Sequence, residues 1–134
     1  MAQKLEGRAK QLLQDKNFAH LAVTRDDGTI QTSVVWVDAD DEGRVIVNTA
    51  EGRDWPRSLR RDGRATISVH NNDNPYEYVS IVASIDEDTH EGADDVIDAL
   101  AKKYLDADSY PGRTVGEQRI TFKLAPEKVL LKGS

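Results

Sequence analysis

Polar side chains and a cluster of arginines lie close together between residues 31 and 64. The neutral side chains come in two pairs and the cations form one group: Thr32 with Ser33, Asn48 with Thr49, and five arginines between Arg53 and Arg64. Neutral donors and acceptors can hold the edge of a planar polar ring, whereas a guanidinium group can bind a phosphate through two N–H groups. Arg53 and Arg57 are four residues apart and therefore share one side of a helix. The run predicts a site for a ring that carries an anionic tail.

The same residues also fit a plainer interpretation. Arginines on a short surface helix commonly form only a solvated face, and serine and threonine are common on strands. Asp54 would oppose an anion at the N-terminus of the predicted helix, although the free backbone N–H groups there favour one. From these residues alone, the anion site and the solvated face both remain open.

The composition excludes several kinds of chemistry. The chain has no cysteine, so disulfides, thiolate nucleophiles, iron–sulfur clusters and cysteine-ligated zinc are excluded. His20, His70 and His90 are widely separated, and none has a carboxylate at the spacing of a metal site or a catalytic triad. The sequence has no Gly-x-Gly-x-x-Gly or Gly-Lys-Thr loop, so a Rossmann or P-loop nucleotide site is not expected. We expect no metal site, and redox chemistry would rest on an organic cofactor.

Charge and hydropathy bear on partners and location. The net charge of −6 disfavours general binding to nucleic acids, which requires an excess of cations. The N-terminus lacks the apolar stretch of a signal peptide, and no segment has the apolar length of a membrane-spanning helix. We therefore expect a cytoplasmic protein that binds neither nucleic acid nor membrane.

Two kinds of apolar periodicity alternate along the chain. Spacings of three and four residues predict helices, and strict alternation predicts strands. The predicted helices are Gln3–Gln14, a short helix from Asp54 to about Gly63, and Glu91–Tyr104. The predicted strands are Phe18–Thr24, Ile30–Val37, Arg44–Thr49, Ala65–His70, Tyr76–Asp86 and Gln118–Leu124, with a short last strand at Val129–Lys132.

The short connections predict how these strands are arranged. Turns at 25–28 and 38–43 predict that the first three strands form an antiparallel meander, and residues 71–75 are expected to form a loop. Parallel βαβ units are disfavoured because so many connections are tight. Residues 1–134 are expected to form a single domain. Its predicted class is mainly β (α+β), with six or seven antiparallel strands in a closed or nearly closed barrel and short flanking helices.

Four segments of the sequence resemble one family of proteins. They are residues 17–28 (NFAHLAVTRDDG), 34–38 (VVWVD), 47–64 (VNTAEGRDWPRSLRRDGR) and 74–78 (NPYEY). Together they resemble the split-barrel flavin and deazaflavin oxidoreductases related to pyridoxamine 5′-phosphate oxidase. The sequence is most similar to the actinobacterial F420-dependent branch, and the resemblance covers residues 17 to about 129. It implies that the antiparallel barrel is a split β-barrel.

The resemblance implies a homodimer with two equivalent cofactor sites between the barrels. In the family, the ring lies against two strands, the basic helix meets the phosphate or the oligoglutamate-bearing tail, and the partner subunit closes the pocket. The corresponding positions are Gln31, Thr32, Ser33, Val34, Asn48, Thr49 and Ala50 for the ring, Arg53 and Arg57 for the tail, and Tyr76 and Tyr78 for the partner's contribution.

Trp55 departs from the family pattern. Many relatives have a lysine at this position, and its loss would weaken the hold on a phosphate. The indole could instead pack on the core or cover the ring, so we count Trp55 among the cofactor-binding residues. This departure disfavours FMN relative to F420.

The activity that the resemblance implies is hydride transfer between reduced F420 and a conjugated organic acceptor. No single catalytic side chain is predicted, because the cofactor performs the chemistry and the protein orients it. An FMN-dependent oxidase or reductase of the same fold is one alternative. A non-catalytic protein that binds a flavin, haem or another tetrapyrrole is the other.

Trp36 and three residues near the predicted loop 105–116 are not among the predicted cofactor-binding positions. Trp36 lies inside a predicted strand, where an aromatic residue packs in a core or in a dimer interface, and we favour the interface. Tyr104, Tyr110 and Arg113 lie in or beside the predicted loop 105–116 and could line a substrate entrance.

Overall fold

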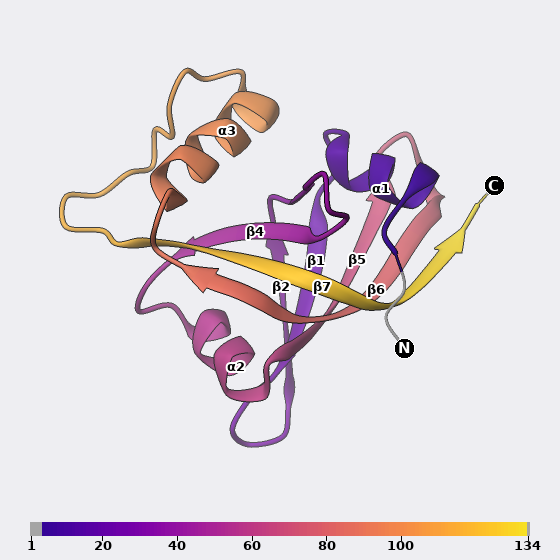
Figure 1. The fold of residues 1–134 in the computed structure, drawn as a ribbon, viewed down its shortest axis with the longest axis horizontal. Coiled ribbons are helices and arrows are strands. Elements are labelled where there is room, and N and C mark those ends of the chain that lie inside the picture. The colour runs from indigo at the N-terminus through magenta and orange to yellow at the C-terminus, as the bar shows by residue number, and fades with distance from the viewer. Residues whose placement is uncertain (1–3, 134) are drawn as a thin grey trace.

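A single curled sheet makes up most of the molecule (Figure 1). The structure is a computed structural model and describes residues 4–133. In this part of the chain, the helices are α1 (Gly7–Gln14), α2 (Asp54–Asp62) and α3 (Ala93–Leu105). The strands are β1 (Ala19–Thr24), β2 (Ile30–Val35), β3 (Asp38–Ala39), β4 (Val45–Ala50), β5 (Arg64–Asn71), β6 (Asn74–Thr89) and β7 (Arg119–Lys132).

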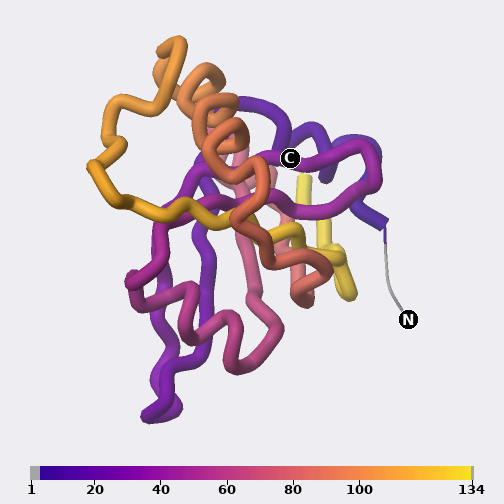
Figure 2. The backbone as a smooth tube through the Cα atoms, turned by 60° about the vertical axis from the view of Figure 1, so that its left-hand side comes forward, coloured from indigo at the N-terminus to yellow at the C-terminus, as the bar shows by residue number. Residues whose placement is uncertain are grey.

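The sheet is antiparallel and does not close on itself. Its strand order is β2-β1-β5-β6-β7-β4-β3, so β2 and β3 form its two edges. Within residues 4–133, no strand pairing joins β2 to β4 or to β3. In Figures 1 and 2, the turn between β1 and β2 lies at the opposite end of the molecule from α3. The architecture confirms a mainly β, seven-stranded split barrel.

The predicted meander is wrong beyond its first hairpin. β1 pairs with β2, but β4 pairs with β7, with Val45 opposite Leu124 and Ala50 opposite Arg119. The reason lies in the apolar run Val45–Val47, in which every residue is buried. A continuous apolar run is typical of a strand buried on both faces in the interior of a sheet, and β4 lies between β7 and β3.

Most of the interior of the barrel is apolar. Fully buried side chains from the paired strands include Leu21, Ile67, Ile81, Ile120, Phe122 and Leu124. On β1 and β5 the buried residues alternate with exposed or half-buried ones, as expected for strands with one face in a core. Leu12 and Leu13 of α1 and Leu59 of α2 join the same cluster. These two helices therefore belong to the barrel core.

α3 packs against β4 and β7 outside that core. Asn48 of β4 donates its Nδ2 to the carbonyl oxygen of Ala93 at 2.9 Å, and its Cα partner across the ladder is Thr121 of β7. Ile97, Leu100 and Tyr104 form a separate apolar cluster, against which Trp36 and Tyr110 pack. In the described part of the chain, no helix is both long enough and apolar enough to cross a membrane.

Two strands are longer than the periodicity predicts. β6 begins at Asn74, inside the predicted loop 71–75, so only residues 72 and 73 separate it from β5. β7 replaces two predicted strands and passes through Pro126, which lies at the shift in register between Val82 and Ala83. A bulge tolerates proline because the missing N–H belongs to an interrupted part of the ladder.

Other predicted elements change at their ends. α1 begins at Gly7, and part of its predicted start at Gln3 lies outside the described residues. β2 ends at Val35, so Trp36 follows the strand and is not inside it. β3 is a two-residue strand within the predicted turn 38–43. The short helix α2 ends at Asp62, and Gly63 follows with a left-handed backbone (φ 73°), which glycine adopts without strain.

Candidate functional site

The open side of the barrel has polar residues at positions that face the interior. Gln31 and Ser33 on β2 lie opposite buried apolar residues of β1. Thr49 on β4 lies opposite the buried Ile120 of β7. Residues directly opposite on paired strands share one face of the sheet, so all three polar side chains belong to the inner face. They mark the two strands between which the barrel is split.

A cavity of about 420 Å³ lies between β2 and β4. This volume is within the range of roughly 300–1,000 Å³ that is usual for small-molecule and cofactor sites. The lining residues are Gln31, Ser33, Val34, Val35, Trp36, Asn48, Thr49, Arg53, Asp54, Trp55, Ile97, Tyr110 and Arg119. The split of the barrel therefore contains a cavity of a size suited to a cofactor.

Two buried oxygen atoms in the cavity wall lack a hydrogen-bond partner among the described residues. They are Oε1 of Gln31 and Oγ1 of Thr49, one from each strand that borders the split. An unsatisfied buried polar atom costs about 1–3 kcal/mol, so natural structures seldom keep one without a reason. A ligand with polar groups along one edge could satisfy both atoms.

The arginine cluster divides into paired and unpaired members. Arg60, Arg61 and Arg64 each form ion pairs: Arg60 with Glu51 and Asp88, Arg61 with Asp26 and Asp62, and Arg64 with Glu127. Arg57 has only a 3.4 Å contact with Asp54, and its side chain is 73% exposed. Arg53 has no ion pair or hydrogen bond with any other described residue. Only Arg53 and Arg57 are therefore available to an anion.

These two arginines line adjoining spaces. Arg53 precedes the first residue of α2 and lines the cavity itself. Arg57 lines a neighbouring cavity of about 360 Å³ that shares Gln31 and Asp54 with the first. Both arginines line a third cavity of about 240 Å³. The two arginines thus line neighbouring spaces beside α2, and the second of these spaces is also lined by Asp26, Asp27 and Asp54.

Trp55 packs on the core and also borders the cavity, and its covering of a bound ring stays a prediction. It is buried, with 7% of its surface exposed, and its ring lies 5.9 Å from that of Phe122 in the core. It also lines the cavity. The indole therefore gives the cavity an apolar wall at the position where the resembling family often has a lysine.

The structure brings together some of the predicted cofactor-binding residues and separates others. Those that line the cavity are Gln31, Ser33, Val34, Asn48, Thr49, Arg53 and Trp55. Those that do not are Thr32, Ala50, Arg57, Tyr76 and Tyr78. Thr32 lies between Gln31 and Ser33 on β2, so its side chain is exposed on the outer face of the sheet. Tyr76 is 80% exposed on β6, so its predicted contribution to a partner's site stays a prediction.

Asn48 lines the cavity, but its amide is committed to internal contacts. Its Nδ2 donates to the carbonyl oxygen of Ala93 and to Oγ1 of Thr121, both at 2.9 Å. Its Oδ1 accepts a hydrogen bond from Nε of Arg119 at 3.0 Å. Both amide hydrogens are therefore used within the protein, and Asn48 positions Arg119.

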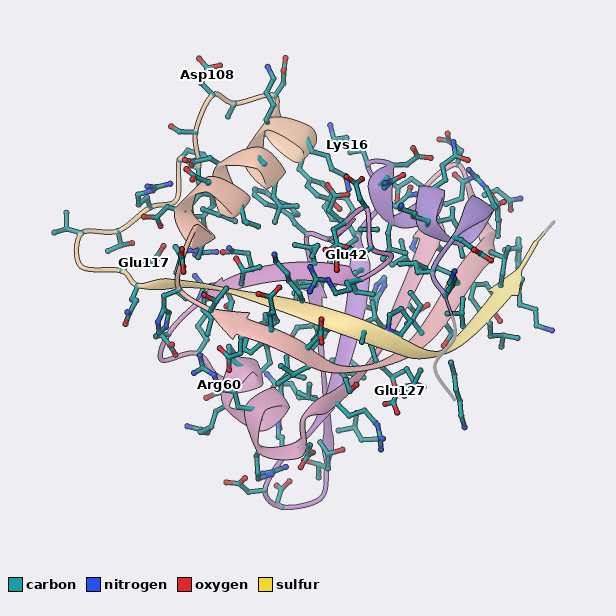
Figure 3. The ribbon with its side chains drawn as sticks, viewed as in Figure 1. Lys16, Glu42, Arg60, Asp108, Glu117 and Glu127 are labelled. Atoms are coloured by element: carbon teal, nitrogen blue, oxygen red, sulfur yellow. The ribbon has the colours of Figure 1, made fainter. Side chains whose placement is uncertain are left out.

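Arg119 is a lining residue that the sequence analysis missed. Its side chain is only 3% exposed, and Nη1 donates to the carboxylate of Glu117 at 3.0 Å. The guanidinium carbon lies 5.0 Å from the centre of the Tyr110 ring. Figure 3 shows Glu117 on the loop that leads into β7 and Arg60 on α2. The cavity thus has a second, buried cation besides Arg53.

Aromatic residues form the α3 side of the cavity. Trp36 stacks on Tyr104 with ring centres 5.2 Å apart and meets the edge of Tyr110 at 6.1 Å. Trp36 and Tyr110 line the cavity, whereas Tyr104 does not. Burial raises the pKa of Tyr104 to about 12, and its hydroxyl accepts a hydrogen bond from the Val37 N–H. Tyr104 is therefore a structural residue and not part of an entrance.

The loop that carries Tyr110 is tied to α3. The carboxylate of Asp98 accepts hydrogen bonds from the Tyr110 backbone N–H at 2.9 Å and from Nη2 of Arg113 at 2.6 Å. Arg113, which could have lined an entrance, therefore anchors the loop and does not line the cavity. The ring of Tyr110 is held beside Arg119 as a result.

A charged network supports the rim between β4 and α2. Glu51, which follows β4, accepts two hydrogen bonds from Arg60 and contacts Nε2 of His90. The Arg60 bonds, followed by the His90 contact, lower the pKa of Glu51 to about 2. Arg60 also binds Asp88 of β6. This network ties the last turn of α2 to the end of β4 and to β6.

The histidines lie outside the cavity, in line with the structural or solvated roles expected of them. The rings of His20 and His70 stack at 5.8 Å on neighbouring strands β1 and β5, and His90 belongs to the rim network. None of the three lines the cavity between β2 and β4. Across residues 4–133, no group of three His, Asp or Glu side chains could hold a metal ion.

Comparison with known proteins bears on the fold. The sequence matches no family model and no curated protein. An F420 reductase structure superposes with a TM-score of 0.80 at 22% identity, over 90% of this chain and 94% of that one. A candidate pyridoxamine 5′-phosphate oxidase from Listeria innocua has a TM-score of 0.72 at 15% identity, over 98% of this chain and 100% of that one. HutZ, the heme storage protein from Vibrio cholerae, has a TM-score of 0.65 at 19% identity, over 98% and 96% of the two chains.

These three structures share one architecture with the chain over nearly its whole length. The identities are too low to carry a function from any of them. The fold that the sequence resemblance implied is therefore confirmed. The chain has the split-barrel fold of the F420 reductase and pyridoxamine 5′-phosphate oxidase-like structures.

Proposed function

We propose that the chain binds a flavin-type cofactor in the cavity between β2 and β4 and acts as an oxidoreductase. The observation that carries this proposal is the pair of unpartnered buried oxygens, Gln31 Oε1 and Thr49 Oγ1, on the two sides of the cavity. Flavin and deazaflavin rings have one edge of carbonyl and N–H groups, which suits such side chains. The fold similarity to an F420 reductase supports the same class of cofactor.

The deazaflavin F420 is the favoured cofactor, and FMN is the alternative. A compact FMN phosphate needs closely set cations. The buried Trp55 stands where many proteins of the resembling family have a lysine, so one such cation is missing here. F420 has a longer tail with several separated anionic groups. Arg53 and Arg57 lie one helical turn apart along the adjoining cavities, which suits a long tail better than a single phosphate.

The chain's own residues would bind and orient the ring. When bound, such a cofactor supplies the transfer of hydride between itself and a conjugated organic substrate. Gln31 and Thr49 would hold its polar edge, and Arg53 would hold the start of its tail. The buried indole of Trp55 provides an apolar wall that limits access of water. No acidic or basic side chain is assigned to the reacting atoms, so the proton that accompanies the hydride would come from solvent or return to it.

A second copy of the chain would complete the site. Val34, His20, Ser68, Ser80 and Leu130 form one row across the outer face of five strands. Val34 is 65% exposed and Leu130 52% exposed, and Val34 also lines the cavity. A face with small and apolar side chains suits packing against a second sheet. Tyr76 and Tyr78 are the residues we propose to close the partner's cavity.

A haem-binding role is the second candidate, because HutZ, a heme storage protein, shares the fold. Haem iron in proteins is commonly held by a histidine. No histidine among the described residues lines this cavity. The flavin-type cofactor is therefore preferred for the cavity between β2 and β4.

The test is a titration of the purified protein with F420 and, separately, with FMN, followed by fluorescence. We expect F420 to bind more tightly. Replacing Arg53 and Arg57 together by alanine should weaken binding about tenfold or more, because two charge-assisted contacts are lost. Arg64→Ala is the matched control, since Arg64 is already paired with Glu127, and it should leave the affinity unchanged.

The outcomes separate the alternatives. Tighter binding of FMN than of F420 would select the FMN-dependent enzyme. Binding of neither ligand would overturn the proposed function, and unchanged affinity in the double variant would remove the assignment of the tail. Light scattering should give about twice the chain mass of 14.9 kDa, and a monomer would contradict the proposed dimer.

A further inference from the structure

Arg119 is a buried cation whose surroundings leave part of its guanidinium group unused. Nε donates to Asn48 at 3.0 Å and Nη1 donates to Glu117 at 3.0 Å. Nη2 makes no hydrogen bond with any described residue. Because arginine has five N–H donors, three of them remain for another acceptor. Yet the side chain is only 3% exposed and lines the cavity between β2 and β4.

The position of this guanidinium group is fixed from two directions. Asn48 and Glu117 hold it in its own plane, and the Tyr110 ring covers one of its faces at 5.0 Å. Asp98 fixes Tyr110 through the backbone N–H of that residue. A guanidinium group that is held in this way loses little conformational entropy when it binds a ligand.

Aromatic and apolar side chains share the lining of the cavity with Arg119 on its α3 side. Trp36 and Tyr110 meet edge to face with an interplanar angle of 85°, and both line the cavity together with Ile97. Two rings at nearly a right angle can contact both the face and the edge of a flat ligand. This end of the cavity differs from the end at Gln31 and Thr49, where neutral polar atoms are unpartnered.

We propose that this end of the cavity is a subsite for a planar aromatic carboxylate. Arg119 would bind the carboxylate through its unused N–H groups, and Trp36, Tyr110 and Ile97 would contact the ring. The planar guanidinium group matches a planar carboxylate with two parallel hydrogen bonds. Of the charged residues that line the cavity, Arg53 and Arg119 are cationic and Asp54 is anionic, so an anionic ligand is favoured by charge.

The inference rests on the proposed function only in placing this subsite beside a bound cofactor. Arg53, at the start of α2, would serve the cofactor's tail, and Arg119, at the start of β7, would serve the second ligand. Each cation would then have its own anion. The experiment therefore needs no cofactor, and its failure would not be a failure of the cofactor proposal.

The test measures binding of 2-naphthoate and of the neutral 2-naphthamide to the full chain by calorimetry. We expect the carboxylate to bind about tenfold or more tightly than the amide, because only the carboxylate forms charge-assisted bonds. Arg119→Lys keeps the charge but loses the planar pair of donors, so it should weaken naphthoate binding about tenfold and leave naphthamide binding unchanged. Arg64→Lys, at an exposed ion pair with Glu127, is the control and should change neither affinity.

Three results would overturn the proposal. The first is equal affinity of the wild-type chain for the two ligands, and the second is unchanged naphthoate binding in a folded Arg119→Lys variant. The third is a loss of naphthoate binding on Arg53→Ala with no loss on Arg119→Lys, which would place the ligand at the other end of the cavity. If Arg119→Lys does not fold, Tyr110→Ala replaces it, and unchanged naphthoate affinity in that variant would overturn the proposal equally.

Discussion

The closed and open sides of the barrel use the same kind of position for different purposes. On the closed side, inward residues such as Ile67 and Ile81 lie opposite each other on β5 and β6 and are fully buried. On the open side, the inward residues of β2 and β4 include Gln31, Ser33 and Thr49. A barrel selected for stability alone would have apolar residues at these positions too. The difference supports the proposal that the polar inward positions serve binding.

This comparison separates stability from function within one small domain. Apolar burial on the closed side supplies stabilising free energy, at about 25 cal/mol per Å² of surface removed from water. The two buried oxygen atoms without hydrogen-bond partners on the open side reduce this stabilising free energy. Proteins commonly accept such a local loss where a ligand binds. Substitutions on the two sides should therefore have opposite effects on stability.

The largest effect is expected on the closed side. Ile81→Ala removes a fully buried side chain from the centre of the core and should lower the free energy of unfolding by about 2–5 kcal/mol. Urea unfolding followed by circular dichroism measures this change. Val115→Ala is the control, because Val115 is fully exposed and its truncation should change the free energy by about 0.5 kcal/mol or less. A change below about 1 kcal/mol for Ile81→Ala would mean that the closed side is not the main source of stability.

A smaller effect of opposite sign is expected on the open side. Thr49→Val replaces a buried, unpartnered hydroxyl by a methyl group and should raise the free energy of unfolding by about 1 kcal/mol. The same variant should bind the cofactor about tenfold more weakly, because one hydrogen-bonding group is lost. Thr32→Val, on the exposed face of β2, is the matched control and should change neither quantity. A destabilised Thr49→Val variant with unchanged binding would contradict the expectation that the open side gives up stability for binding.

The sequence predicts the closed side better than the open side for a physical reason. Alternation along β1 and β5 is a local property, so strands and their inward faces can be read from a few residues. The order of strands is not local. The ladder places Asn48 beside Thr121, a residue 73 positions later, and nothing near Asn48 specifies that partner.

The candidate site was predictable only in part for the same reason. Thr49 and Arg53 stand out because a polar strand end and an arginine cluster are visible in the sequence. Which arginines remain free depends on distant carboxylates, since Arg64 pairs with a glutamate 63 positions away. Arg119 was missed because it begins an ordinary-looking strand and acquires its role from Asn48, 71 positions earlier.

The smallest predicted effect concerns the charged rim of the open side. Glu51 has a pKa lowered to about 2 by hydrogen bonds from Arg60 and contact with His90. A carboxylate whose pKa is lower in the folded than in the unfolded chain stabilises the fold above its unfolded pKa, near 4.5. This contribution is lost as the pH falls toward about 2. The rim should therefore weaken in acid, whereas the apolar closed side should not.

Glu51→Gln tests this expectation because it removes the titrating group and keeps the shape of the side chain. The variant should be less stable than the wild type at neutral pH, and the gap should shrink as the pH is lowered from about 4.5 toward about 2. Urea unfolding at several pH values measures the gap. Glu127→Gln is the comparison variant, because Arg64 also lowers the pKa of Glu127 but that ion pair is more exposed to solvent than the pair of Glu51 with Arg60. A gap for Glu51→Gln that stays constant with pH would show that this rim is held by packing, as the closed side is, and not by its charges.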